Sequence, residues 1–231
     1  MALETLFLDA GGVLVHPNWQ RVSDTLARHG VRVTPDALRR ADPTAKFAVD
    51  EGTMVATTTD AERAWPYMHG VMHHAGAGDS PGVDAALDEL RAYHAEHNLW
   101  EHVPGDVVPA LKRLRALNLR LVVVSNANGV LHRAFDRIGL TRYFDVICDS
   151  CVEGVEKPDP RFFEIALTRS RGRAETTLHV GDLYHVDVVG ARRAGLQAIL
   201  LDAAGLYEGY DCERVSTLDA LVDSVARAQR V

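Results

Sequence analysis

The sequence predicts an α/β fold, a doubly wound (Rossmann-like) parallel sheet core with an all-helical cap domain. Three observations predict this fold. Short apolar runs alternate along the chain with segments of helical periodicity, most runs end at polar residues, and about a hundred residues separate the first two runs. Strands that alternate with helices form parallel sheets with helices on both faces.

Five apolar runs are predicted to be buried strands. They span residues 3–8, 119–124, 143–147, 177–180 and 197–201. Helical periodicity marks the segments between the later runs, at residues 107–117, 130–138, 160–168 and 186–194. Because the carboxyl ends of parallel strands lie on one edge of a sheet, the polar residues that follow these runs are expected to meet there.

The gap between the first and second strands is much longer than one crossover helix requires. Apolar residues recur in this gap at helical spacing, and glycines interrupt the pattern. We expect a four-helix accessory domain, residues 16–103, inserted into a core formed by residues 1–15 and 104–231. It would follow the first strand and cover the carboxyl edge of the sheet, where open parallel sheets bind ligands.

Composition excludes several classes of protein. The 231 residues include 25 Lys plus Arg and 32 Asp plus Glu, which gives a net charge of −7. This acidic balance argues against a nucleic-acid binder. No apolar run reaches the roughly 18 residues of a membrane span, and no secretion signal precedes the first strand. We therefore expect a cytoplasmic protein that binds neither nucleic acid nor membrane, with Cys148, Cys151 and Cys212 as free thiols.

Polar residues of different chemistry follow the predicted strands. They are Asp9, Ser125 with Asn126, Lys157, and Asp182 with Asp187. Carboxylates, a hydroxyl and an ammonium gathered on one edge can hold a divalent cation and an anion and present a nucleophile between them. This combination predicts phosphoryl transfer.

The order of these motifs resembles the haloacid dehalogenase superfamily of hydrolases, with a helical cap inserted after the first motif. The resemblance covers essentially the whole chain. It is carried by four segments: Asp9-Ala10-Gly11-Gly12-Val13-Leu14, Val124-Ser125-Asn126, Glu156-Lys157-Pro158-Asp159, and the run from Gly181-Asp182 through Asp187 to Gly190-Ala191.

The resemblance implies a role for each matching residue. Asp9 would be the nucleophile that becomes an aspartyl phosphate, and Ser125 and Lys157 would bind the transferring group. Gly12 and Asn126 would complete the phosphate-binding site. Mg²⁺ would be held by Asp9, the Gly11 carbonyl and Asp182, with Asp187 binding directly or through water. The substrate would be a small phosphorylated molecule, and the protein a monomer or homodimer.

Gly11 departs from the family pattern. Phosphatases of this superfamily usually carry a second Asp at this position, where it protonates the leaving group and then activates water. Such acid–base catalysis contributes roughly 10²–10⁴-fold, so we expect alkyl phosphates to be poor substrates unless another group substitutes. His16, seven residues beyond Asp9, is a candidate replacement acid, but a loop histidine that caps or packs is the favoured interpretation.

Three interpretations of the function remain open. A magnesium-dependent phosphatase or phosphotransferase is favoured. The second is chemistry of the haloacid dehalogenase or phosphonate hydrolase type, the latter with Lys46 as a Schiff-base amine, and the third is a non-catalytic relative that binds a phosphorylated ligand. His69, His73 and His74 are expected to form a surface or substrate-facing patch rather than a zinc site.

Overall fold

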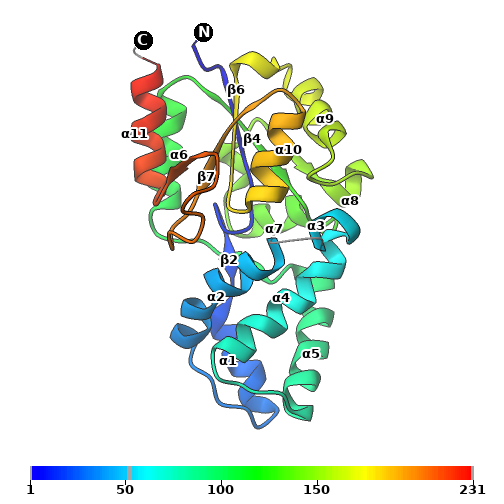
Figure 1. Cartoon of the computed structure of the whole chain (residues 1–231). Helices are drawn as coiled ribbons and strands as arrows, with labels where there is room; N and C mark the ends of the chain where they lie inside the picture. Colours follow the sequence, from blue (N-terminus) through cyan, green and yellow to red (C-terminus); the bar gives the residue numbers. More distant parts are fainter. Residues whose placement is uncertain (1, 51–53, 230–231) are drawn as a thin grey trace. The chain divides into compact units, whose positions relative to one another are not determined.

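The computed structural model describes residues 2–50 and 54–229 (Figure 1). The chain divides into two compact units, one formed by Met1–His16 with Val103–Val231 and the other by Pro17–His102. That the first unit is a catalytic core and the second a cap stays a prediction.

The first unit contains a six-stranded sheet whose strand order is β5-β4-β1-β6-β7-β8. All its strand pairs are parallel. The strands are β1 (Thr5–Leu8), β4 (Arg120–Ser125), β5 (Val146–Asp149), β6 (Thr177–Gly181), β7 (Gln197–Leu201) and β8 (Glu213–Val215). The chain winds outward from β1 to β5 and then returns to the other side of β1. This confirms the doubly wound α/β fold and places its switch point between β1 and β6.

Helices cover both faces of this sheet. Figure 1 shows α6 (Val107–Ala116) beside α11 (Leu218–Ala228) on one face, and α9 (Pro160–Ser170) with α10 (Val189–Arg193) on the other. Two shorter helices, α7 (Leu131–Arg137) and α8 (Ser150–Glu153), follow β4 and β5. On the face of the sheet that α9 and α10 cover, strand and helix residues form an apolar core that includes Phe7, Val122, Phe162 and Phe163.

Local sequence explains where these elements begin and end. Every residue of β1 is buried, as expected for a central strand covered on both faces. Helix α9 begins after Asp159, whose side chain accepts a hydrogen bond from the backbone N–H of Arg161, and Pro160 occupies its first position. Both features are typical of helix starts.

The segment predicted as one helix, residues 186–194, is helical but is not one regular α-helix. The structure has a π-helical turn, Tyr184–Val188, followed by the short helix α10. Asp187 lies in the wider turn and is completely buried, with its side chain turned toward the core. The π-helix occurs most often as such single turns, frequently at functional sites.

The second unit is helical apart from the strand residues at its two ends. It contains four longer helices, α1 (Trp19–Arg28), α2 (Pro35–Asp50), α4 (Asp60–His74) and α5 (Pro81–His97), and the one-turn helix α3 (Met54–Thr57). Its core includes Val22, Leu26, Leu38 and Met68. The chain passes between the units where β2 (His16–Pro17) and β3 (Trp100–His102) form a two-stranded sheet.

None of the helices that the structure describes combines the length and apolar composition that crossing a membrane requires.

Candidate active site

The candidate site begins at the switch point of the sheet. Leu8 of β1 is the register partner of Val180 of β6, and the backbone N–H of Asp9 donates to the carbonyl of Val180 at 2.9 Å. Asp9 therefore directly follows β1, just as Asp182 directly follows Gly181, the last residue of β6. The adjacent strands bring the two acidic residues to the same edge, as the sequence predicts.

Lys157 joins two carboxylates at this edge. Its Nζ lies 2.9 Å from Oδ1 of Asp9 and 2.7 Å from Oδ1 of Asp187. The Lys157 side chain is only 1% exposed, so its ammonium has little contact with solvent. A buried ammonium needs such partners because the loss of hydration is costly.

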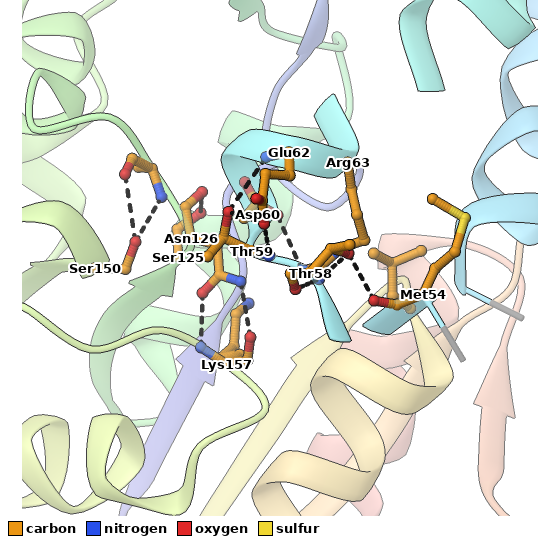
Figure 2. A network of polar contacts seen from close by, with 12 residues as sticks. Met54, Thr58, Thr59, Asp60, Glu62, Arg63, Ser125, Asn126, Ser150 and Lys157 are labelled. Atoms are coloured by element: carbon orange, nitrogen blue, oxygen red, sulfur yellow. Dashed lines mark hydrogen bonds and ion pairs between the residues drawn. The ribbon is translucent and has the colours of Figure 1, made fainter. Parts of the chain in front are cut away.

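The main chain of Lys157 is fixed by Asn126 (Figure 2). The backbone N–H of Lys157 donates to Oδ1 of Asn126 at 2.8 Å, and Nδ2 of Asn126 donates to the carbonyl of Lys157 at 3.0 Å. This pair joins the segment after β4 to the segment that carries the lysine. The Asn126 side chain thus holds Lys157 in place, and its predicted contact with phosphate stays a prediction.

Ser125 is the last residue of β4 and is buried. Among the described residues, the one contact of its hydroxyl is a long one, 3.4 Å, to the carbonyl of Asn126. The following loop is held by Ser150, whose hydroxyl oxygen accepts from the N–H of Ala127 at 3.0 Å and donates to its carbonyl at 3.3 Å (Figure 2). Its place at the strand end suits Ser125 for the predicted contact with a transferring group.

Asp187 is held by three donors. Its Oδ1 accepts from Lys157 and from Nε2 of His179, the latter at 2.9 Å, and its Oδ2 accepts from the N–H of Leu183 at 3.1 Å. Gly181 allows this carboxylate to come close to β6, because a Cβ at Gly181 would lie 2.0 Å from Cγ of Asp187. The glycine before Asp182 is thus required by the packing of Asp187.

The electrostatics of the site are those of an incompletely neutralised acidic cluster. Burial raises the pKa of Asp9 to about 6; Lys157 opposes this shift, whereas Asp187 and Asp182 add to it. Despite burial, Lys157 and His179 hold the pKa of Asp187 below its usual range. Burial likewise opposes charge on Lys157, but Asp187 and Asp9 raise the pKa of its ammonium. At neutral pH, Lys157 is a cation and Asp187 an anion.

Three carboxylates form a candidate metal centre. One ligand atom from each of Asp9, Asp182 and Asp187 lies within 4.8 Å of the others. Carboxylate oxygens are the ligands that Mg²⁺ prefers, at about 2.0–2.1 Å in octahedral geometry. Three carboxylates against one ammonium leave an excess of negative charge, which a divalent cation would neutralise.

The glycines after Asp9 shape the loop that follows β1. Gly12 has φ +77°, a conformation that favours glycine, and its N–H donates to the carbonyl of Val15 at 2.9 Å. The N–H of Ala10 donates to Oδ1 of Asp9 at 2.8 Å. The predicted roles of the Gly11 carbonyl and of Gly12 stay predictions.

Other predicted residues lie outside this cluster. His16 lies in β2. In the helical unit, Nζ of Lys46 lies 3.5 Å from Oδ2 of Asp42. Nε2 of His69 and Nδ1 of His73 lie 3.3 and 3.5 Å from the same oxygen of Asp79, and these side chains are exposed.

The histidines of α4 do not form a compact metal site. Among the residues that the structure describes, the acidic cluster is the one group of three or more candidate ligands whose atoms lie within 4.8 Å of one another. The three cysteines are free thiols, as predicted. Burial raises the pKa of the Cys148 thiol to about 11.

Sequence reasoning missed three residues that support the site. His179 donates to Asp187, Gly181 makes room for it, and Gly190 lets α10 approach the residue after Lys157, because a Cβ there would lie 2.9 Å from Cα of Pro158. Gly181 and Gly190 both belong to the segment Gly181 to Ala191 that carries the family resemblance, and this could have indicated their importance. His179 stands in an apolar strand, where a histidine is a weak signal.

A doubly wound parallel sheet with a lysine and carboxylates gathered at its switch point is an arrangement found in a class of α/β hydrolases. This chain belongs to the haloacid dehalogenase-like hydrolases: the model of that family matches residues 3–195. The protein is therefore a hydrolase of this family.

Individual relatives agree with this assignment. The chain is 32% identical over 129 residues to the bovine haloacid dehalogenase-like hydrolase domain-containing protein 3, a match that covers 56% of this chain and 51% of the relative. The match thus spans about half the length of that relative. This chain is also 30% identical over 158 residues to a glyceraldehyde 3-phosphate phosphatase of Methanothermobacter thermautotrophicus. That match covers 67% of this chain and 69% of the relative.

Among solved structures, the hydrolase YfnB of Bacillus subtilis, described with bound magnesium, has a TM-score of 0.70 at 17% identity. The superposition covers 97% of this chain and 99% of YfnB. This similarity supports the fold.

Proposed function

We propose that this hydrolase is a magnesium-dependent phosphatase or phosphotransferase that acts through an aspartyl phosphate on Asp9. Its substrates would be small phosphorylated metabolites. The observation that carries the proposal is the position of Lys157, whose ammonium bridges Asp9 and Asp187 at the edge where Asp182 also lies. The name of the archaeal relative, a phosphatase of a small sugar phosphate, supports the substrate class.

Asp9 is suited to attack phosphorus. The contacts that the structure describes for its carboxylate, with Lys157 and with the N–H of Ala10, all fall on Oδ1. In the proposed first step Oδ2 forms a bond to phosphorus while the bond from phosphorus to the ester oxygen breaks, and the leaving oxygen takes the electron pair. In the second step the oxygen of water attacks phosphorus, the bond from phosphorus to Oδ2 breaks, and its electron pair returns to the Asp9 carboxylate. Inorganic phosphate leaves, and the proton lost by water passes to the phosphate or to solvent.

The remaining residues would stabilise charge on the transferring group. Two of the three ammonium hydrogens of Lys157 are directed to Asp9 and Asp187, and the third can reach a phosphoryl oxygen. Ser125 would add a neutral donor at the end of β4. A magnesium ion held by Asp9, Asp182 and Asp187, with the Gly11 carbonyl, would supply further positive charge at the phosphoryl group.

Gly11 limits which substrates suit this site. The leaving oxygen needs a proton when it is an alkoxide, and a glycine has no side chain to supply one. We therefore expect acyl and aryl phosphates, whose leaving groups are weakly basic, to react faster than alkyl phosphates. The hydrolysis of the aspartyl phosphate would also be slow, because no side chain at this position activates water.

Gly11 also favours a second candidate, chemistry that needs no acid at this position. This candidate includes dehalogenation and phosphonate hydrolysis through a Schiff base on Lys46. In the Schiff-base version Lys46 would be the reacting amine, and its Nζ lies 3.5 Å from Oδ2 of Asp42. Dehalogenation would use Asp9 as the nucleophile but has no use for the further carboxylates of Asp182 and Asp187. A non-catalytic relative would bind phosphorylated ligands without turnover.

The test is phosphate release from acetyl phosphate, p-nitrophenyl phosphate and simple sugar phosphates, with Mg²⁺ and with EDTA. We expect metal-dependent turnover that falls as the pKa of the leaving group rises, a rapid burst of leaving group, and no turnover in Asp9→Asn. Turnover unaffected by EDTA, or retained by Asp9→Asn, would reject the proposal. Halide release from a haloacid would favour dehalogenation instead, and ligand-induced stabilisation without turnover would indicate a binding protein.

The substitution Gly11→Asp tests the account of the missing acid. It places a carboxyl group two residues after the nucleophile, so we expect alkyl phosphate hydrolysis to increase by about 10²-fold and the burst to shrink. Gly11→Asn, of similar size but without an acid, is the control. Equal rates in the two variants would mean that proton transfer at this position does not limit the reaction.

A further inference from the structure

His179 is an unusual residue for its place in the fold. It lies in the middle of β6, opposite Phe7 of β1, and it is completely buried. Its ring meets that of Phe163 edge to face, with centroids 5.0 Å apart. It therefore occupies a position in the apolar core under the active site where an aliphatic residue would fit the surroundings.

One ring nitrogen of His179 has a defined task. Nε2 lies 2.9 Å from Oδ1 of Asp187, and a carboxylate only accepts hydrogen bonds, so Nε2 carries the hydrogen. The other nitrogen, Nδ1, is buried without a hydrogen-bond partner in the part of the chain that the structure describes. The Nε2–H group is thus a donor aimed at Asp187.

The unpaired Nδ1 shows that this ring is not there for stability alone. A buried polar atom without a partner costs about 1–3 kcal/mol. An apolar residue in this core position would avoid that cost. What the histidine adds is the single hydrogen bond to Asp187.

That hydrogen bond is part of a continuous chain of charged contacts. His179 donates to the Asp187 oxygen that also receives Lys157, and Lys157 in turn contacts Asp9. With Leu183 on its second oxygen, Asp187 is held at both oxygens. Loss of the His179 donor would let the carboxylate rotate about its Cβ–Cγ bond toward Lys157, and the spacing of the acidic cluster would change.

We propose that His179 is a positioning residue of the active site, which orients Asp187 for the binding of a divalent cation and for holding Lys157. This inference rests on the proposed function, because it assigns a partner to the metal centre. Outer hydrogen-bond partners of metal ligands commonly contribute 10–100-fold to metal affinity or activity. His179 does not contact the reacting atoms and acts through Asp187.

Three substitutions separate the hydrogen bond from the packing of the ring. Gln places its amide nitrogen the same number of bonds from Cα as Nε2 of histidine, so His179→Gln can keep the donor. His179→Met has similar length and no donor. His179→Asn carries an amide whose nitrogen is one bond too short to reach Asp187.

The measurement is the Mg²⁺ dissociation constant of the full chain by calorimetry, with phosphatase kinetics as a second readout. We expect His179→Met and His179→Asn to bind Mg²⁺ about 10–100-fold more weakly and His179→Gln to stay within about threefold of the wild type. Thermal unfolding in EDTA records the packing effect separately. If His179→Met or His179→Asn fails to fold, the other still gives the comparison with His179→Gln.

Two results would overturn the inference. One is wild-type Mg²⁺ affinity in the folded Met or Asn variant, which would make His179 a packing residue. The other is equal weakening in Gln and Met, which would mean that the ring and not the donor matters. Failure of the proposed function looks different, because the wild-type chain itself would then show no Mg²⁺ binding or no metal-dependent turnover.

Discussion

Gly181 shows at the residue scale how closely the active site is packed. A Cβ at this position would lie 2.0 Å from Cγ and 2.3 Å from Oδ2 of Asp187, so the carboxylate would have to move. We expect Gly181→Ala to destabilise the protein by about 1–3 kcal/mol, as overpacking does. Mg²⁺ affinity should fall at least 10-fold. Chemical denaturation and calorimetry measure the two effects.

A matched control for this substitution lies in the same unit. Gly105 has no atom within 4 Å of the position that a Cβ would occupy, and its φ is not in the positive range. Gly105→Ala should therefore leave stability within about 0.5 kcal/mol and Mg²⁺ affinity unchanged. Equal effects of the two substitutions would contradict the steric explanation.

The raised pKa of Asp9 predicts a specific pH dependence of metal binding. Burial raises this pKa to about 6 in the metal-free protein, so the carboxyl group is mostly protonated at pH 5 and mostly ionised at pH 7. A cation binds the ionised form. The apparent Mg²⁺ dissociation constant should increase about tenfold for each pH unit below 6 and be constant above about pH 7. A constant value from pH 5 to pH 7 would indicate an unshifted carboxyl group.

At this scale the sequence predicts which charged residues gather at the edge of the sheet better than it predicts the residues that hold them in place. Asp9, Lys157, Asp182 and Asp187 could be predicted because each follows an apolar run, or a motif, at one edge of a parallel sheet. The clamp of Asn126 on Lys157 could not, because it joins residues 31 positions apart. His179 was missed because a histidine in a strand gives no indication of the carboxylate to which it donates.

At the scale of elements, Asp149 ties the end of β5 to the loop that follows β4. Its buried carboxylate accepts from the backbone N–H groups of Gly129 at 3.0 Å, Leu131 at 3.2 Å and Cys151 at 3.0 Å. Ser125, at the end of β4, is its register partner. One side chain thus fixes both the start of α8 and the loop beside Ser125.

We expect Asp149→Ala to destabilise the protein by about 2–4 kcal/mol, because three N–H groups, of which that of Leu131 is buried, lose a charged acceptor. The turnover number should also fall, since the loop beside Ser125 is released, while Mg²⁺ affinity should change little. Asp159→Ala is the control, because within the described residues this partly exposed cap of α9 accepts from Arg161 alone. Its loss should cost about 1 kcal/mol without affecting turnover. If both variants lose only stability, Asp149 has no role in positioning Ser125.

The elements that sequence could predict are those with a strong apolar pattern. The central strands β1, β4, β6 and β7 have it and were predicted within about two residues. β8 (Glu213–Val215) was not predicted, because two of its three residues, Glu213 and Arg214, are charged and exposed. It lies at the edge of the sheet, paired with β7. Helix α11 carried a signal that was not used, an N-cap at Thr217 followed by an amphipathic segment.

At the scale of the whole molecule, the candidate chemistry resides in one of two compact units. The residues proposed to bind, attack or neutralise charge all belong to the unit formed by Met1–His16 with Val103–Val231. They are Asp9, Ser125, Lys157, Asp182 and Asp187. Pro17–His102 has a separate apolar core. The chain passes between them at only two places, which allows the helical unit to be removed genetically.

We expect a chain in which residues 17–102 are replaced by a short Gly-Ser linker to fold and to bind Mg²⁺ within about threefold of the full-chain affinity. Its metal ligands, the Asn126 clamp and the apolar cluster under the sheet are all retained. If the helical unit determines substrate choice, as a cap does, this chain should lose preference among sugar phosphates while still hydrolysing acetyl phosphate. The same deletion in Asp9→Asn controls for contaminating phosphatase. If the shortened chain unfolds cooperatively but binds no Mg²⁺, the helical unit is needed to form the metal centre. If its substrate preference is unchanged, the sheet-containing unit determines specificity.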